Sequence, residues 1–364
     1  MATRLKLKQL LLIIGVWLIL GFIISVYDHL LLHSSNSLGP DESYSFLLSV
    51  ARNMGGGLIG GLLGGSLLVF FVNEKYQDKP YGYTILIVSV SFLLIIAFIA
   101  VIMGLFIVPP RTGKPISDPV SQQALFRFLT DSTPLKAALV WSFIVAITQL
   151  LLQVNRKFGY GTFWNIIRGK YNTPKEEERI FMFLDINSST SIAERLGDKA
   201  YHALLKDFFA DITNPILNNE GHIYQYAGDE VIISWNYRED TAAAHCVRCF
   251  FDMKLHIQER RQKYLHRYGL VPSFKAGIHS GKVVAGEVGI IKRDITYSGD
   301  VLNTAARIRG MCKEFNVDLI GSASLLNALH PGSNLVVTPL GSIKLRGKEK
   351  SVLLSSVRLI DILA

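Results

Sequence analysis

Two aspartates, each beside a run of residues typical of a β-strand, are the first candidates for chemistry in this sequence. Asp185 stands near the end of "RIFMFLDI", and Asp229 follows the Ala227-Gly228 turn inside "IYQYAGDEVIIS". Both runs are rich in the β-branched and aromatic residues that strands favour. A lone carboxylate at a hairpin tip is most often a solvated turn residue. Two converging carboxylates, however, suit Mg²⁺, which prefers a few carboxylates together with substrate phosphates.

A phosphate site is expected next to Asp185. Ser188, Ser189 and Thr190 stand at the start of the helix predicted after the first strand. Free N–H groups and the helix dipole attract phosphate there, although serine and threonine are also ordinary N-caps. In a split βαβ layout the first strand and the hairpin of Asp229 can be neighbours in the sheet. We therefore predict a Mg²⁺–nucleotide site where they meet.

The elements that must position these residues alternate between strand and helix patterns, which predicts an α+β sandwich of the ferredoxin-like kind. After the first strand come a helix over 188–217, the hairpin and a helix over about 240–266. Two strands, "SFKAGIHSG" and "KVVAGEVG", then a helix over 301–312, the strand "VDLIGS" and a β-meander complete the pattern.

The first 155 residues are far more apolar, and four segments approach the ~20 residues needed to cross a bilayer. They are 9–27, 55–73, 83–108 and 135–154. Basic residues in "TRLKLK" and after the fourth span indicate that both ends of this region face the cytoplasm. The segment 109–134 is then an outward loop. We predict a multi-pass protein of the inner membrane with a helical membrane domain (1–154), a cytoplasmic connector (155–177) and a cytoplasmic domain (178–364).

The second span contains "GGGLIGGLLGGS", in which glycines recur every four residues. Such faces let helix backbones approach closely in lipid. These glycines could line the interface of a dimer or the contact between two helices of one bundle, and the sequence leaves both interpretations open. The net charge of +9 does not indicate a nucleic-acid partner, because no helix-turn-helix, zinc-finger or aromatic-basic pattern accompanies it.

The second half of the chain resembles the catalytic domain of class III nucleotide cyclases, the adenylate and guanylate cyclase family. Within that family, the chain is similar to the bacterial members that are anchored in the membrane. Five segments, spread over about 178–358, occur in the order and spacing of that family. They are "FLDINSST", "YAGDEVI", "AGIHSGKVVAGEVG", "YSGDVLNTAARI" and "LRGKEKSV".

The resemblance implies a two-metal site. Asp185 and Asp229 match the metal-binding aspartates, and the carbonyl of Ile186 would join them in holding two Mg²⁺ or Mn²⁺ ions. One ion would lower the pKa of the ribose 3′-hydroxyl, and the other would hold the β- and γ-phosphates. The products would be a 3′,5′-cyclic nucleotide and pyrophosphate.

Other matching positions imply contacts to a nucleoside triphosphate. Asn303 would orient the ribose, and Arg307, one helical turn later, would stabilise charge on the α-phosphate. Lys348 matches a triphosphate-binding lysine, and Lys282 is a second candidate. In this family one catalytic domain supplies the aspartates and another supplies the Asn–Arg pair, so the resemblance implies a homodimer with two equivalent sites.

The two base-selecting positions depart from the usual pattern. Gln225 stands where adenylate-forming members place Lys, and Thr296 where they usually place Asp. A glutamine amide both donates and accepts, so it can face adenine or guanine by flipping. ATP is the first expectation, with GTP and a pyrimidine nucleotide as alternatives.

Two other functions share features with this sequence, a diguanylate cyclase and a non-catalytic receptor. A diguanylate cyclase has a "GGDEF" turn, whereas "AGDEV" lacks its first Gly and its Phe. The second alternative is a membrane receptor whose cyclase-like domain binds nucleotide without converting it. Gln225 supports this alternative because it departs from the residues that cyclases place at that position. Polar neighbours are given structural roles: Glu230 is expected to point away from Asp229, Asp300 to cap the helix over 301–312, and His279 to pack within its strand. The C-x-x-C of 246–249 is expected to be core packing on a helix.

Overall fold

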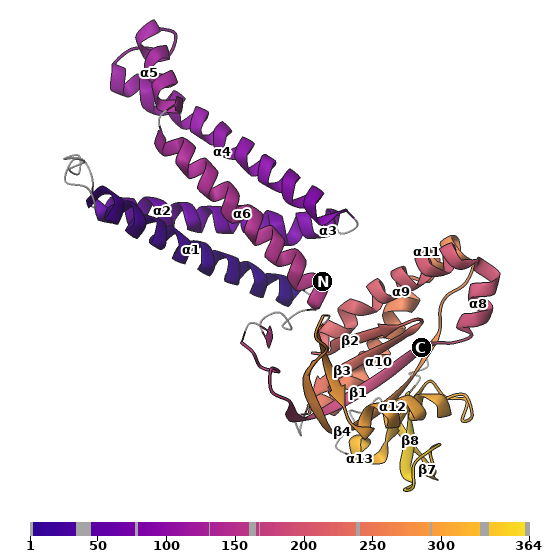
Figure 1. Ribbon diagram of the computed structural model, residues 1–364. Helices are drawn as coiled ribbons and strands as arrows, with labels where there is room; N and C mark the ends of the chain where they lie inside the picture. Colours follow the sequence, from indigo (N-terminus) through magenta and orange to yellow (C-terminus); the bar gives the residue numbers. More distant parts are fainter. Residues whose placement is uncertain are drawn as a thin grey trace. The chain divides into compact units, whose positions relative to one another are not determined.

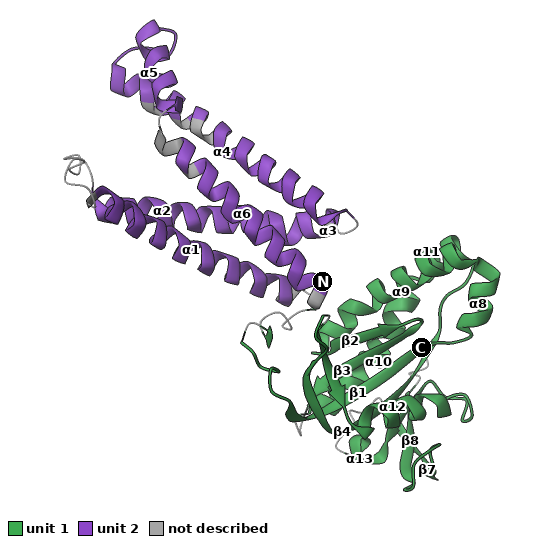
Figure 2. Ribbon diagram, viewed as in Figure 1, with its two compact units in different colours: residues 1–2, 159–364 green, residues 3–158 purple. Residues whose placement is uncertain are grey.

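The computed structural model describes residues 3–33, 45–76, 79–130, 132–159, 165–166, 168–237, 241–291, 293–327 and 335–360. The chain forms two compact units (Figure 2). One unit is Thr3–Phe158, and the other is Gly159–Ala364 together with the first two residues.

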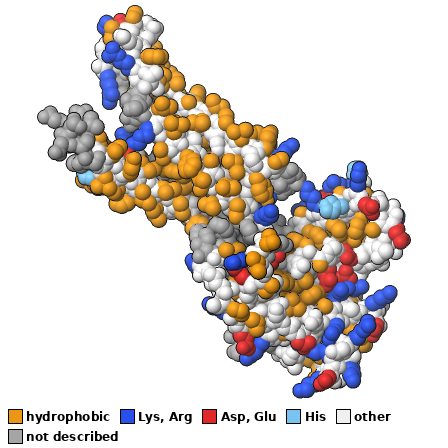
Figure 3. Space-filling model, in the orientation of Figure 1, with side chains coloured by type: hydrophobic (Ala, Val, Ile, Leu, Met, Phe, Trp, Pro, Cys, Tyr) orange, Lys and Arg blue, Asp and Glu red, His pale blue; other side chains and the backbone are white. Residues whose placement is uncertain are grey.

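The first unit is helical in its described part, and its helices are apolar on most sides. Four helices among the described residues are long and apolar enough to cross a membrane, as predicted. Their apolar stretches are Leu5–Leu32, Phe46–Val72, Tyr81–Phe98 and Ala138–Lys157. Hydrophobic side chains cover the visible surface of this unit (Figure 3), which suits a lipid surrounding.

In chain order the elements of this unit are α1 (Thr3–His33), α2 (Phe46–Gly60), the π-helical η1 (Gly61–Gly65) and η2 (Leu67–Val72), α3 (Asn73–Lys75), α4 (Tyr81–Thr112), α5 (Pro119–Thr130) and α6 (Ser132–Phe158). The segment 109–134, expected as a loop, is therefore largely helical. Packing explains the difference, because Leu125 of α5 lies close to α4: a Cβ added at Gly104 would stand 2.5 Å from its side chain.

The glycine-rich second span packs against α1 of the same chain. A Cβ added at Gly57 would stand 2.7 Å from the carbonyl oxygen of Trp17, and one at Gly61 would stand 3.1 Å from Ile14. Only glycine allows backbones to come this close. Of the two roles left open by the sequence, this row of glycines supports packing within one bundle.

A mixed sheet forms the centre of the second unit, and the predicted α+β fold is confirmed (Figure 1). In its described part the strands run in the order β2-β3-β1-β4-β6-β8-β7, with β5 paired to β4. The elements are β1 (Lys175–Ile186), α8 (Ser189–Leu196), α9 (Asp198–Asn218), β2 (His222–Ala227), β3 (Glu230–Asn236), α10 (Ala242–Glu259), α11 (Arg261–Tyr268), β4 (Phe274–Val288), β5 (Asp294–Ser298), α12 (Asp300–Met311), β6 (Leu319–Ser322), α13 (Ala323–Leu326), β7 (Leu335–Ile343) and β8 (Val352–Leu359).

Residues 179–186 of strand β1 are covered on both faces of the sheet. Successive side chains of a strand point to opposite faces, so they join two different cores. Met182 and Leu184 join the core formed with α9 and α10, which includes the buried cysteines of the C-x-x-C. Phe181 and Phe183 pack instead with Ala305 of α12. Helices α9 and α10 thus cover one face of the sheet, and α12 covers the other.

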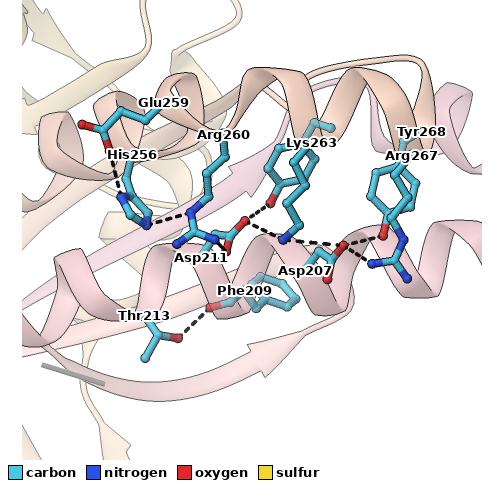
Figure 4. A network of polar contacts seen from close by, with 11 residues as sticks. Asp207, Phe209, Asp211, Thr213, His256, Glu259, Arg260, Lys263, Arg267 and Tyr268 are labelled. Atoms are coloured by element: carbon cyan, nitrogen blue, oxygen red, sulfur yellow. Dashed lines mark hydrogen bonds and ion pairs between the residues drawn. The ribbon is translucent and has the colours of Figure 1, made fainter. Parts of the chain in front are cut away.

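Polar contacts fix α11 to α9 (Figure 4). Asp211 of α9 is buried, accepts a hydrogen bond from the Tyr264 hydroxyl at 2.9 Å and pairs with Arg260 at 2.9 Å. One turn earlier, Asp207 pairs with Arg267 at 2.7 Å. Basic side chains of this segment are therefore engaged within the unit.

The chain that enters β1 is anchored to the sheet. Tyr171 is buried, and its carbonyl accepts a hydrogen bond from the Glu287 N–H of β4 at 3.1 Å. Its hydroxyl donates to Glu177 at 3.2 Å, and Glu177 pairs with the buried Arg179 at 2.7 Å. The Arg179 guanidinium lies over the ring of Tyr297 in β5, 4.6 Å from its centroid. Part of the stretch predicted as a connector thus belongs to the folded sheet.

Candidate active site

Asp185 and Asp229 lie together at one end of the sheet. Asp185 is the penultimate residue of β1, and Asp229 stands in the turn between β2 and β3. The pKa of Asp185 is raised above its ordinary value, chiefly by burial. A hydrogen bond with Asp229 also raises this pKa, whereas the nearby Arg309 guanidinium opposes the rise. The structure therefore brings together the two aspartates that the sequence predicts to converge.

Arg309 of α12 reaches the same point. Its Nη1 donates to Asp185 Oδ2 at 2.8 Å, and its Nη2 lies 3.5 Å from both carboxylate oxygens of Glu230. Lys275 of β4 lies on the same side, with Nζ 3.8 Å from Asp185 Oδ2. Two cations thus face the carboxylates from α12 and β4.

Glu230 belongs to this cluster, which corrects the expectation that it is a bystander. It stands directly opposite Asp185 in the β1–β3 register, and directly opposed residues of paired strands project to the same face of a sheet. Burial raises the pKa of Glu230, and Arg309 lowers it. The cluster therefore contains Asp185, Asp229 and Glu230.

The oxygen donors at this point fit Mg²⁺ or Mn²⁺. Asp185 and Asp229 offer carboxylates, and the backbone carbonyl of Ile186 follows directly. Across the described residues, no group of three or more His, Cys, Asp or Glu side chains is already arranged to hold an ion. A few carboxylates with positions left for water and substrate phosphates are the usual surrounding of Mg²⁺, and Mn²⁺ accepts the same oxygen ligands.

The start of α8 lies beside the aspartates. Ser188, the residue before the helix, has a left-handed backbone with φ 56°, and its side chain caps no N–H group in the described chain. Ser189 hydrogen-bonds to Tyr201, whose pKa is raised by burial and by Asp229. Ser188 and Thr190 are exposed, so they are accessible to an anionic ligand.

Asn303 and Arg307 lie on a different face of α12 from Arg309. At 100° per residue they stand roughly 200–240° around the helix axis from it. Asn303 is exposed. Arg307 lies beside the loop before Lys348, since a Cβ added at Gly347 would stand 3.3 Å from its Nη2. The structure therefore does not bring the Asn–Arg pair to the aspartates of the same chain.

Lys348 lies next to this face of α12. Its Nζ is 2.6 Å from Asp300 Oδ2 and 2.7 Å from the Thr304 hydroxyl. The hydrogen bond with Lys348 lowers the pKa of Asp300. Asp300 was expected to cap α12, but the cap position belongs to Gly299 and Asp300 is the first helical residue. Its carboxylate binds Lys348 and also accepts a hydrogen bond from the Thr304 hydroxyl at 3.3 Å.

Lys282 lies elsewhere. It is exposed and pairs with Glu176 of β1 at 3.0 Å. In the β1–β4 register it stands opposite Glu178, seven residues from Asp185, which is roughly 23 Å along a strand. Lys282 does not meet the aspartates of its own chain, and its role as a phosphate ligand stays a prediction for a site shared between chains.

Gln225 and Thr296 lie on β2 and β5, each next to a tyrosine that joins the two strands. The rings of Tyr224 and Tyr297 meet edge to face at 5.0 Å, and the Tyr297 N–H donates to the Tyr224 hydroxyl at 3.4 Å. Gln225 is exposed, and the Thr296 hydroxyl donates to the Gly286 carbonyl at 3.5 Å. Both positions predicted to select the base thus flank one aromatic contact.

Residues 172–355 match the family model described as the adenylate and guanylate cyclase catalytic domain. The chain belongs to this family. The chain is 38% identical over 205 residues to adenylate cyclase 2 of Rhizobium meliloti (strain 1021), and the match covers 56% of each chain. It is 29% identical over 183 residues to adenylate cyclase 1 of the same organism, covering 48% of this chain and 27% of that protein. The chain thus spans about half or less of these relatives.

The fold of the cyclase domain is similar to that of solved cyclases. A bacterial light-regulated adenylyl cyclase has a TM-score of 0.53 and 20% identity to this chain, covering 63% of it and 66% of that protein. At this identity the likeness concerns the fold alone.

Four residues of the cyclase domain at this site were unassigned or misassigned from the sequence: Tyr201, Glu230, Lys275 and Arg309. A physical signal existed for Arg309, since clustered carboxylates half-buried in a protein require a facing cation. The sequence offered several basic residues, however, and only the packing of α12 selects this one.

Proposed function

We propose that this chain is a membrane-bound nucleotide cyclase that converts ATP to 3′,5′-cyclic AMP and pyrophosphate in a homodimer. One observation carries the proposal. The aspartates and the Asn303–Arg307 pair face different sides of α12, so a single chain supplies only part of a site. A second copy of the chain completes it, and the symmetry of a homodimer then gives two equivalent sites.

Each half-site has a distinct task. Asp185, Asp229 and the carbonyl of Ile186 hold the metal, while Ser188, Ser189 and Thr190 lie where phosphates are expected. Bound Mg²⁺ or Mn²⁺ supplies Lewis acidity to the ribose 3′-hydroxyl and charge neutralisation to the triphosphate. The other chain contributes residues from α12 and the loop that follows β7.

The reaction forms a bond between the ribose 3′-oxygen and the α-phosphorus and breaks the bond from that phosphorus to the oxygen bridging to the β-phosphate. Pyrophosphate leaves, and the hydroxyl proton passes to solvent. Asn303 orients the ribose for this attack, and Arg307 stabilises the charge that develops on the α-phosphate. Lys348, held by Asp300 at 2.6 Å, is positioned to bind the triphosphate.

ATP is the proposed substrate, supported by the names of the two Rhizobium meliloti relatives. GTP and a pyrimidine nucleotide are the second candidates, because Gln225 and Thr296 present neither the Lys nor the Asp of the usual adenine pair. A site without a committed donor or acceptor discriminates less, since a wrong base leaves fewer buried groups unpaired.

The four apolar helices support a membrane location. The proposed membrane is the inner membrane, with the N-terminus and the cyclase domain in the cytoplasm, because basic residues flank both ends of the helical region. The proposed organisation is a membrane domain over 1–154, a connector over 155–177 and a cyclase domain over 178–364. The anchoring of Tyr171 to β4 supports a connector whose last part moves with the sheet.

The test uses the full-length protein in detergent or nanodiscs with Mg²⁺ or Mn²⁺. ATP, GTP, CTP and UTP are offered separately, and products are identified by mass spectrometry. One dominant cyclic nucleotide with equimolar pyrophosphate supports the enzyme and names its base. Bound nucleotide without pyrophosphate from any of the four supports a non-catalytic receptor instead.

A further inference from the structure

We propose that Arg309 is a built-in counter-ion of the metal site. It binds Asp185 in the metal-free chain and moves to Glu230 when a divalent metal takes its place. The proposal rests on the proposed function, since it assumes that Asp185 and Asp229 hold the metal.

The contacts of Arg309 span both partners. Nη1 binds Asp185 at 2.8 Å, whereas Nη2 is 3.5 Å from each oxygen of Glu230. The Nε of Arg309 is buried and has no hydrogen-bond partner among the described residues. A guanidinium can donate two parallel hydrogen bonds to one carboxylate. A shift onto Glu230 would use such a pair and satisfy the orphaned Nε.

Charge gives the exchange its direction. Asp185, Asp229 and Glu230 are neighbouring carboxyl groups. Arg309 contacts Asp185 and Glu230, and Lys275 lies 3.8 Å from Asp185. The side chains of Asp185, Glu230 and Arg309 are only 13%, 19% and 25% exposed, so solvent screens their interactions weakly. A divalent ion competes with Arg309 for Asp185, and Glu230 accepts the displaced guanidinium.

The backbone around the exchange is fixed. Asp185 and Glu230 are directly paired in the β1–β3 register, which sets their Cα atoms about 5 Å apart. Helix α12 packs on β4 so closely that a Cβ added at Gly277 would stand 2.2 Å from the Arg309 backbone nitrogen. Only the Arg309 side chain needs to move, and both carboxylates lie within its reach.

The test measures Mn²⁺ binding by the full-length protein in detergent, without nucleotide, from the electron paramagnetic resonance signal of free Mn²⁺. Arg309→Gln removes the competitor, so we expect Mn²⁺ to bind about tenfold tighter, the scale on which neighbours of metal ligands act. Arg309→Lys keeps the competing charge at Asp185, so it should not reproduce this gain in affinity. Glu230→Gln weakens binding. The matched control is Arg358→Gln, an exposed arginine of β8, which leaves binding unchanged.

A second measurement separates competition from simple destabilisation. Without metal, Arg309→Gln lowers the melting temperature of the cyclase domain, because the carboxylates lose their counter-ion. Saturating Mn²⁺ narrows this gap, because the variant binds the ion more tightly than the wild type. A gap of unchanged size at saturating Mn²⁺ assigns Arg309 a purely structural role and overturns the proposal.

The double variant tests the role of Glu230. If Glu230 acts by receiving Arg309, Glu230→Gln weakens Mn²⁺ binding less in the Arg309→Gln background than in the wild type. Equal weakening in both backgrounds makes Glu230 an independent ligand and overturns the exchange. Unchanged or weaker Mn²⁺ binding in Arg309→Gln overturns the counter-ion role itself.

Asp185→Asn distinguishes this inference from the proposed function. Wild-type Mn²⁺ affinity in Asp185→Asn would show that the metal site is elsewhere, and the proposed function would fail with it. Lost Mn²⁺ binding in Asp185→Asn together with unchanged binding in Arg309→Gln would remove only the counter-ion.

Discussion

Gly277 of β4 and Arg309 of α12 meet backbone to backbone. A Cβ added at Gly277 would stand 2.2 Å from the Arg309 nitrogen and 2.6 Å from the Ala305 carbonyl oxygen. Real Cβ atoms do not approach backbone this closely, so the helix requires glycine beneath it. This contact positions the Arg309 side chain to bind Asp185. It also fixes the directions in which Asn303 and Arg307 project from α12.

Gly277→Ala is therefore expected to displace α12. Forcing extra volume into a packed contact typically costs about 1–3 kcal/mol, so the cyclase domain should melt at a lower temperature and lose activity. Gly310→Ala is the matched control, because an added Cβ at Gly310 meets nothing within 4 Å in the described structure. Differential scanning calorimetry of both variants, with cyclase assays, checks this. Equal melting temperatures for the two variants would contradict it.

Asp229→Ala and Arg307→Ala are each expected to lower the rate at least about 10²-fold, as loss of a charge-stabilising group typically does. Co-expression of the two variants should restore part of the activity. One of the two sites in a mixed dimer would then keep both its aspartate and its arginine. Tandem affinity purification of the mixed dimer before the assay isolates the relevant species. A mixed dimer as inactive as either parent would rule out a shared site.

Gln225→Lys should narrow the choice of base. A lysine only donates, so it suits the N1 acceptor of adenine and opposes the N1–H of guanine. One committed hydrogen bond is worth about 1–3 kcal/mol when its loss leaves a group unpaired, so the ratio of kcat/KM for ATP over GTP should rise about tenfold. Gln225→Asn, which keeps both donor and acceptor, is the control. An unchanged ratio in Gln225→Lys would place base selection elsewhere.

His279 should make the cyclase domain less stable as the pH falls. Its Nδ1 lies 2.8 Å from the Ser322 hydroxyl, and burial, with nearby Lys348, lowers its pKa to about 4. Below its ordinary pKa of about 6.5 the unfolded chain gains a proton that the folded chain refuses, so stability is lost between about pH 6.5 and 4.

The expected loss between pH 7.5 and 5.0 is on the order of 2 kcal/mol. His279→Gln keeps a polar partner for Ser322 and should lose less over the same interval, measured as the melting temperature of the cyclase domain at both pH values. Identical pH dependence of the two proteins would exclude His279 as its source.

The division into an apolar helical region and an α+β domain could be predicted from the amino-acid sequence, because hydropathy and periodicity are local properties. The family could be predicted as well, since the residues of the five segments are read without knowing where they lie in space. The run "RIFMFLDI" likewise predicts a strand, and its successive apolar residues suit the burial on both faces that the structure shows.

The ends of the helices and strands could be predicted less well from the sequence. The helix expected over 188–217 is broken at Gly197, whose φ of 75° ends α8, and the helix expected over 240–266 is divided at Arg260. The two strands expected between Phe274 and Val288 form the single strand β4, and β5 was not expected. Helical periodicity continues across a single break, so pattern alone did not locate these ends.

The neighbours of the carboxylates, in contrast, depend on how distant parts of the chain pack together. Register places Glu230 opposite Asp185, helix packing at Gly277 selects Arg309, and the seven-residue offset along β1 keeps Lys282 away. The same packing turns Asn303 and Arg307 away from the aspartates of their own chain. Such relations depend on contacts between residues up to 124 positions apart, and local propensity carries no information about them.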